Sequence, residues 1–235
     1  MRTRVLIALT ALLVALAPQV ALADDTPPPP KPLAVAAKST APFIAYSALP
    51  FSEAAGAAHA YLGAGDVRIM RTDTSDDHAL TTGPATEFEP AFSPDGKLVA
   101  FSSDRADTST GRTDIWVVRR DGTGLRRLTT GLNARGPAWS PDGKTLAAGS
   151  DTGIVTFPAA GKRAVVRVTA NDATHSDFAP VFTMDGTHLL FTRTSLAGGA
   201  VTGQTLWTVA LSGAGARALL DETAPSGFLS QPDVS

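Results

Sequence analysis

The sequence Pro90-Ala91-Phe92-Ser93-Pro94-Asp95-Gly96 decides the fold, because it recurs along the chain. It returns as Pro137-Ala138-Trp139-Ser140-Pro141-Asp142-Gly143 and as Pro180-Val181-Phe182-Thr183-Met184-Asp185-Gly186. A last trace, Gln231-Pro232-Asp233-Val234-Ser235, stands at the C-terminus. The prolines of successive copies are 47, 43 and 52 residues apart. Recurrence at such a period indicates a repeat architecture.

Each repeat predicts four short antiparallel strands, here called a to d. Strand a is the Pro-x-aromatic-Ser segment, and the Asp-Gly pair then turns the chain back, since these residues tolerate the positive φ of tight hairpins. Strand b is expected at 98–102, 145–149 and 188–192, strand c at 114–119 and 206–211, and strand d at 125–129. Four strands in units of about 40–50 residues indicate the blade of a β-propeller, an all-β fold.

The first unit starts at strand b. Residues 43–47 match strand b of the next unit, and strands c and d are expected at 67–72 and 78–82. Strand a is missing there, whereas the C-terminal trace is a strand a without b, c or d. Together the two fragments would complete one blade and remove two exposed sheet edges.

Further motifs surround the repeat in its second copy. Ser103-Asp104-Arg105 follows strand b, Asp114-Ile115-Trp116-Val117 forms strand c, and Asp121-Gly122-Thr123-Gly124 precedes Arg127-Leu128-Thr129. This pattern resembles the TolB-like, WD40-like (PD40) propeller repeat over residues 43–235. The resemblance implies a scaffold of the cell envelope or the extracellular space, in rings that usually have six blades.

About four blades are therefore expected, and two interpretations stay open. The C-terminal strand closes a four-blade ring, or the chain is a truncated form of a six-blade propeller. An open arc would leave edges that a second copy of the chain could complete.

The N-terminal residues have the pattern of an export signal. Two arginines precede an apolar run at 5–17, and Ala21-Leu22-Ala23 offers a small-x-small cleavage site before Asp24. The run is too short for a membrane-spanning helix and is followed by Pro18. We expect a signal peptide at 1–23, a Pro-rich linker at 24–42 and a propeller at 43–235, in a secreted or periplasmic protein without a membrane span after cleavage.

Charge and cysteine content exclude several functions. The formal net charge of −2 disfavours nucleic-acid binding, which needs a basic face. With no Cys, the chain has no disulfides, thiolate metal sites or Cys nucleophiles. No cofactor and no metal ligand set is predicted.

Blade geometry separates two faces. The a–b and c–d turns lie on one face, and the irregular b–c and d–a loops, including 83–89, 131–136, 170–179 and 193–203, lie on the other. Loops on a rigid scaffold carry most binding functions, so the second face is the predicted binding face. Its candidate residues are Glu87, Glu89, Asp104, Arg105, Asn133, Arg135, Asp151, His175, Asp177 and Arg193. Ordinary solvated loops are the alternative for each of them.

Catalytic motifs are weak in this sequence. Asp151-Thr152-Gly153 matches an aspartic-protease triplet, but that chemistry needs a second carboxylate, and the repeat places the triplet in a tight b–c turn. His175-Ser176-Asp177 contains the residue types of a catalytic triad, but sequence neighbours rarely point together. No catalytic residue is therefore assigned.

Two classes of function remain. The first is a non-enzymatic scaffold that binds a protein or peptide at the b–c and d–a face. The alternative is a propeller-type hydrolase or lyase, or a fragment of a propeller-containing peptidase.

Overall fold

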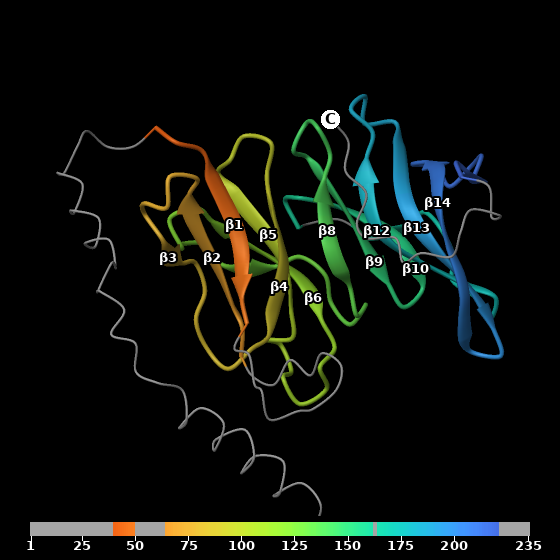
Figure 1. Cartoon of the computed structure of the whole chain (residues 1–235), viewed down its shortest axis with the longest axis horizontal. Coiled ribbons are helices and arrows are strands. Elements are labelled where there is room, and N and C mark those ends of the chain that lie inside the picture. Colours follow the sequence, from red (N-terminus) through yellow and green to blue (C-terminus); the bar gives the residue numbers. More distant parts are fainter. Residues whose placement is uncertain (1–39, 50–63, 162–163, 221–235) are drawn as a thin grey trace, which may run out of the picture. The chain divides into compact units, whose positions relative to one another are not determined.

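The computed structural model describes residues 40–49, 64–161 and 164–220, and these residues form fifteen β-strands and no helix. The strands form four antiparallel sheets in chain order (Figure 1), one with three strands and three with four. The predicted all-β, blade-like architecture is confirmed. The proposed signal peptide, the linker up to residue 39 and the C-terminal trace of strand a lie outside the described residues.

Each sheet is one blade of consecutive strands. The first blade contains β1 (Phe43–Ala48), β2 (Asp66–Arg71) and β3 (His78–Ala79). The second contains β4 (Glu87–Phe92), β5 (Leu98–Ser103), β6 (Asp114–Arg119) and β7 (Arg126–Arg127). The third contains β8 (Arg135–Trp139), β9 (Thr145–Ser150), β10 (Gly153–Pro158) and β11 (Val166–Arg167). The fourth contains β12 (His175–Phe182), β13 (His188–Ala197), β14 (Ala200–Ala210) and β15 (Arg217–Ala218).

The repeated Ser-Pro-Asp-Gly motif builds the a–b hairpin turns. Ser93 donates its hydroxyl hydrogen to Asp95 at 2.7 Å, and the same Asp95 oxygen accepts the Lys97 backbone N–H at 3.1 Å. The Ser93 hydroxyl in turn accepts the N–H of Leu98 at 3.0 Å. The Ser140–Asp142 and Thr183–Asp185 pairs repeat this arrangement. Among the side chains, only the hydroxyl and the carboxylate make these bonds. Thr183 can therefore replace the serine, and Met184 can replace the proline, in the third copy of the motif.

A bulge interrupts strand a at the same place in three blades. The pairing register shifts between Phe88 and Ala91 in β4, and the matching shifts occur in β8 and β12. The residue before the motif proline has positive φ each time: 54° at Glu89, 62° at Gly136 and 51° at Ala179. Proline fits here because it has no N–H to contribute to the strand pairing.

The cores lie between neighbouring blades. Along β9, Leu146 and Ala148 pack towards the second blade, whereas Ala147 packs towards the fourth. Alternate side chains of one strand thus enter two different cores, because successive residues point to opposite faces. The inner strands β4, β8 and β12 contact one another in sequence, and β1 contacts β4.

The first and fourth blades show one confirmation and one correction. The first blade has strands b, c and d but no strand a among the described residues, as the sequence predicts. The predicted b–c loop at 193–203 is wrong, because β13 and β14 continue through it as a long hairpin with a turn at Gly198 and Gly199. Gly tolerates the positive φ that this turn needs, so two glycines are enough to connect the strands.

Candidate functional site

A cavity of about 460 Å³ opens between the third and fourth blades. It is formed by the d–a loops, the tight b–c turn of the third blade and the first residues of β8 and β12. This is the face predicted from the sequence. The residues that line it are Asn133, Arg135, Gly149, Ser150, Asp151, Asn171, Ser176, Asp177 and Phe178. Four predicted residues therefore come together here: Asn133, Arg135, Asp151 and Asp177.

Hydrogen bonds fix the lower part of the cavity around Asp151. Asn133 donates to one Asp151 carboxylate oxygen at 2.8 Å, and Arg112 donates to the other at 2.6 Å. Burial acts to raise the pKa of Asp151, but these two hydrogen bonds and the charges of Arg112 and Arg135 outweigh it and lower that pKa. Asp151 is therefore a carboxylate in a turn, as the repeat register predicts, with both oxygens hydrogen-bonded to neighbouring side chains. It does not share a proton with a second carboxylate as in an aspartic protease.

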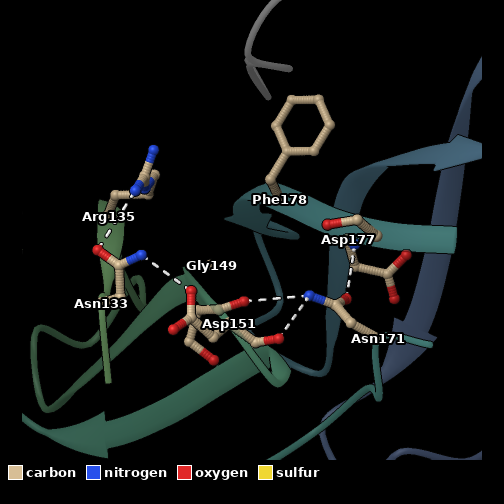
Figure 2. Close-up of a pocket in the computed structure, with 9 residues that line it drawn as sticks. Asn133, Arg135, Gly149, Asp151, Asn171, Asp177 and Phe178 are labelled. Atoms are coloured by element: carbon tan, nitrogen blue, oxygen red, sulfur yellow. Dashed lines mark hydrogen bonds between the residues drawn. The ribbon is translucent and has the colours of Figure 1, made fainter. Parts of the chain in front are cut away.

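Asn171 joins the two blades at the bottom of the cavity. Its side-chain amide donates to the carbonyl oxygens of Ser150 at 3.1 Å and Asp151 at 3.3 Å. Its side-chain oxygen accepts the backbone N–H of Asp177 at 2.8 Å. These bonds, drawn in Figure 2, fix the b–c turn of the third blade against the start of β12.

Arg135 and Phe178 stand at the two sides of the cavity. In Figure 2 both side chains extend above the row formed by Asn133, Asp151 and Asn171. The exposed Arg135 guanidinium donates to the amide oxygen of Asn133 at 3.3 Å and forms no salt bridge with any residue of the described segments. The cavity thus combines a cation, an aromatic ring and a polar floor that is fixed by hydrogen bonds.

Asp177 forms a buried ion pair behind the cavity. Its carboxylate accepts two hydrogen bonds of 2.7 Å from Arg193, whose guanidinium lies 4.1 Å from the ring centroid of Trp207. The second blade repeats the arrangement with Glu87, Arg105 and Trp116. An acid–Arg–Trp group therefore recurs in both blades, and it contains four of the predicted charged residues.

Glu87 has a second polar neighbour in the same buried cluster. Thr81 donates its hydroxyl hydrogen to the Glu87 carboxylate, and Arg105 Nε donates to it at 2.8 Å. Burial raises the pKa of Glu87, while the bond from Thr81 and the charge of Arg105 act to lower it. Asp104 lies next to this cluster and accepts the backbone N–H of Thr86 at 2.8 Å.

The last two predicted residues lie apart from the cavity lining. His175 Nε2 is 2.9 Å from the carbonyl oxygen of Ala170, and Nδ1 is 3.0 Å from Asp172. Glu89 accepts a hydrogen bond from Ser102 at 3.1 Å.

The sequence-based placement of the candidates in loops needs correction. The structure places Asp104, Arg105, Asn133 and Asp151 outside strands, but it places Glu87, Glu89, Arg135, His175, Asp177 and Arg193 within β4, β8, β12 and β13. The reason is that strand a starts before its motif proline, beyond the bulge, and that β13 is longer than the repeat predicts.

Sequence reasoning missed the uncharged part of the cavity. Gly149, Ser150, Asn171, Ser176 and Phe178 line it but are not among the predicted residues. Asn171 follows strand d in a predicted d–a loop, which is the one signal that could have identified it. The packing of Gly149 against the backbone of Phe178, 3.3 Å from where a Cβ would lie, requires the structure.

A second cavity, of about 450 Å³, lies on the a–b and c–d turn face between the first two blades. The guanidinium carbons of Arg71 and Arg120 lie 4.1 Å and 4.9 Å from the ring centroid of Phe43 in its wall. Arg71 also donates to the Ala41 carbonyl oxygen at 2.7 Å. This cavity contains none of the predicted site residues.

The described residues contain neither a cluster of metal-binding side chains nor a membrane-spanning helix. Within 40–49, 64–161 and 164–220, no group of three or more His, Asp or Glu side chains is placed to hold a metal ion. The same segments contain no helix of the length and apolar character needed to cross a membrane.

Comparison with a family model covers most of the chain. A model described as PD40, TolB beta propeller domain, matches residues 54–232. An uncharacterized protein of Agrobacterium fabrum, Atu1656, is 38% identical over 64 residues, which are 27% of this chain and 20% of that protein.

Solved structures resemble the chain in fold. A TolB candidate from Agrobacterium tumefaciens is 21% identical, with a TM-score of 0.60 over 73% of this chain and 62% of that one. TolB from Acinetobacter baumannii is 22% identical, with a TM-score of 0.51 over 67% and 38%. An oligogalacturonate lyase from Vibrio parahaemolyticus is 15% identical, with a TM-score of 0.50 over 67% and 47%. The chain thus spans less than two thirds of each of these relatives.

Proposed function

The chain belongs to the family of TolB β-propeller domains, and on that premise we propose that it is an exported, non-enzymatic scaffold that binds a protein or peptide. The binding site in this proposal is the cavity between the third and fourth blades. Its place of action is the cell envelope or the extracellular space.

The observation that carries the proposal is the composition of this cavity. Its walls are the rigid inner strands of two blades, and its base is hydrogen-bonded through Asn133 and Asn171. Sites that bind small groups are concave and combine apolar walls with a few fixed polar groups, and the Phe178 ring and the Arg135 guanidinium supply such a pair. A volume of about 460 Å³ suits one or two side chains of a peptide.

The non-enzymatic part of the proposal rests on the arginines that already bind the two carboxylates of the cavity. Asp151 and Asp177 are both bound by arginines, so neither carboxylate is free to accept a proton or attack a substrate. His175 contacts Asp172 and the carbonyl oxygen of Ala170 and does not line the cavity. A hydrolase or lyase activity remains the alternative, and the relevant screen compares wild type with Glu89, Arg135 and His175 variants.

Export is the part of the proposal that the N-terminal sequence supports. The expected product of signal cleavage starts at Asp24. N-terminal sequencing of the protein purified from the producing cells and from their medium tests this. A mature chain that starts at Asp24 in the envelope or medium fraction supports export, and an intact Met1 in the cytoplasm contradicts it.

The binding proposal is tested with peptides selected by display against the full-length chain. We expect selected peptides to lose affinity for Phe178→Ala, which removes the aromatic wall, and for Ser176→Tyr, which fills the cavity. Met184→Tyr is the matched control, because Met184 is 67% exposed in the a–b turn of the fourth blade. Binding that survives both cavity substitutions but not the control would contradict the proposed site.

A further inference from the structure

The two carboxylates that line the blade 3–4 cavity, Asp151 and Asp177, are each hydrogen-bonded to an arginine outside the cavity lining. Both Asp151 oxygens accept hydrogen bonds from Asn133 and Arg112, and both Asp177 oxygens accept them from Arg193. Each carboxylate therefore has its own cation. Arg135 is the additional cation, and its hydrogen-bond partner is a neutral amide oxygen.

The surroundings of Arg135 leave most of its donors available. A guanidinium has five N–H donors in a fixed fork, and one of them reaches Asn133. The Asn133 oxygen is shared, since it also accepts the backbone N–H of Thr113 at 3.1 Å. A guanidinium of this kind matches the two oxygens of a carboxylate, which it can bind through parallel hydrogen bonds.

Two other groups make the cavity suitable for a residue that carries a carboxylate. Ser176 lines the cavity, and its hydroxyl has no hydrogen-bond partner among the described residues. The Phe178 ring extends to the same side as Arg135 in Figure 2 and offers an apolar surface. A ligand with a carboxylate next to an apolar side chain would use all three groups.

We propose that the blade 3–4 cavity recognises a carboxylate of its peptide ligand, bound by Arg135, with an adjacent apolar side chain against Phe178. This inference rests on the proposed peptide binding and adds the chemical class of the bound group. The carboxylate is that of a peptide C-terminus or of an Asp or Glu side chain, and the experiment separates these two sources.

The test uses three capped dipeptides and the full-length chain. Acetyl-Ala-Phe with a free carboxylate represents a C-terminus, acetyl-Asp-Phe-amide represents an acidic side chain, and acetyl-Ala-Phe-amide has no carboxylate. Titrations followed by amide chemical shifts give both the affinity and the location. We expect at least one carboxylate peptide to bind about tenfold more tightly than the uncharged amide, the effect of one charge-assisted hydrogen bond.

Arg135→Gln should remove this preference, so that the carboxylate peptides no longer bind more tightly than the uncharged amide. Arg217→Gln is the control, because Arg217 is an exposed arginine on the outer strand β15 of the same blade as Phe178. Equal affinity of all three peptides for wild type, absence of any binding, or a preference that Arg135→Gln leaves intact would overturn the inference. So would shifts confined to Phe43, Arg71 and Arg120 at the second cavity.

The two proposals fail in different ways. If display-selected peptides need Phe178 but bind equally with and without a carboxylate, peptide binding stands and carboxylate recognition is wrong. If no selected peptide depends on the cavity, the proposed function itself is wrong.

Discussion

Arg193 donates two hydrogen bonds of 2.7 Å to the two carboxylate oxygens of Asp177, whose side chain is 0% exposed. Arg193→Met should lower the free energy of unfolding by about 3–5 kcal/mol, because it leaves a buried carboxylate without its cation. Urea unfolding at neutral pH, followed by intrinsic fluorescence, measures the loss.

The control for this prediction is the exposed pair of Arg112 and Asp151. Their side chains are 50% and 47% exposed, so Arg112→Met should cost less than about 1 kcal/mol. Equal losses in the two variants would show that Asp177–Arg193 is not the stabilising pair that its burial indicates.

The strand-a bulge predicts opposite effects of two reciprocal substitutions. Ala179 has a φ of 51° and Gly136 a φ of 62° at equivalent positions of two blades. Left-handed backbone costs an L-residue about 1–2 kcal/mol more than glycine. Ala179→Gly should therefore raise the melting temperature and Gly136→Ala should lower it, each by the equivalent of about 1 kcal/mol.

Steric clash does not complicate this comparison. A Cβ at Gly136 would meet Glu89 at 3.7 Å as its nearest neighbour, which is ordinary van der Waals contact. Ala210→Gly in β14, where φ is not positive, controls for the general cost of glycine in a strand. A destabilised Ala179→Gly variant would refute the backbone argument.

Asn171 predicts a local effect on the start of β12. Asn171→Ala removes the acceptor of the Asp177 N–H and the donor to the Ser150 carbonyl oxygen, which should cost about 1–3 kcal/mol. Hydrogen exchange at the Asp177 amide should become faster. Asn171→Asp keeps the acceptor oxygen, so the amide should stay protected while stability still falls; loss of protection in both variants would argue against this bond.

The a–b turns predict a loss of stability in acid. The Thr183 hydroxyl and the Thr187 N–H lower the pKa of Asp185 from 3.8 to about 2. A carboxylate whose pKa is lower in the folded chain stabilises it above the unfolded pKa, and this contribution is lost as pH falls through the folded pKa. Asp185 should therefore stabilise the fold above pH 4 and lose that effect towards pH 2.

Urea midpoints of wild type and Asp185→Asn at pH 7, 4, 3 and 2 measure this contribution. The wild type should be the more stable protein at pH 7 and 4, and the difference should shrink between pH 4 and 2. A difference that is constant with pH would mean that the carboxylate charge has no part in the turn.

The strand order and turns could be predicted from the sequence because each depends on local chemistry. The Ser-x-Asp-Gly turn is built by hydrogen bonds within a few residues, as at Ser93 and Asp95, and therefore recurs wherever those residues do. The three-stranded form of the first blade within residues 40–49, 64–161 and 164–220 followed from the same repeat.

The roles of the candidate residues could not be predicted, because they depend on contacts between distant positions. Asp177 and Asp151 are both acids of the same face, but Arg193 buries the first and Arg112 leaves the second half-exposed. Strands β13 and β14 are longer than the repeat predicts, so the sequence placed Arg193 in a loop and did not predict its pairing with Asp177. Phe178 precedes the strand a predicted from Pro180 onwards, and the pairing register shifts between Phe178 and Val181, so its position at the cavity required the structure.

The central claim is that the blade 3–4 cavity is the peptide-binding surface. The most direct measurement is hydrogen exchange of the full-length chain with and without a display-selected peptide. The account predicts added protection in segments 131–135 and 171–178, with no change at the Ser93–Gly96 and Ser140–Gly143 turns on the opposite face. Protection confined to those turns, with none around Asn171 and Phe178, would contradict it.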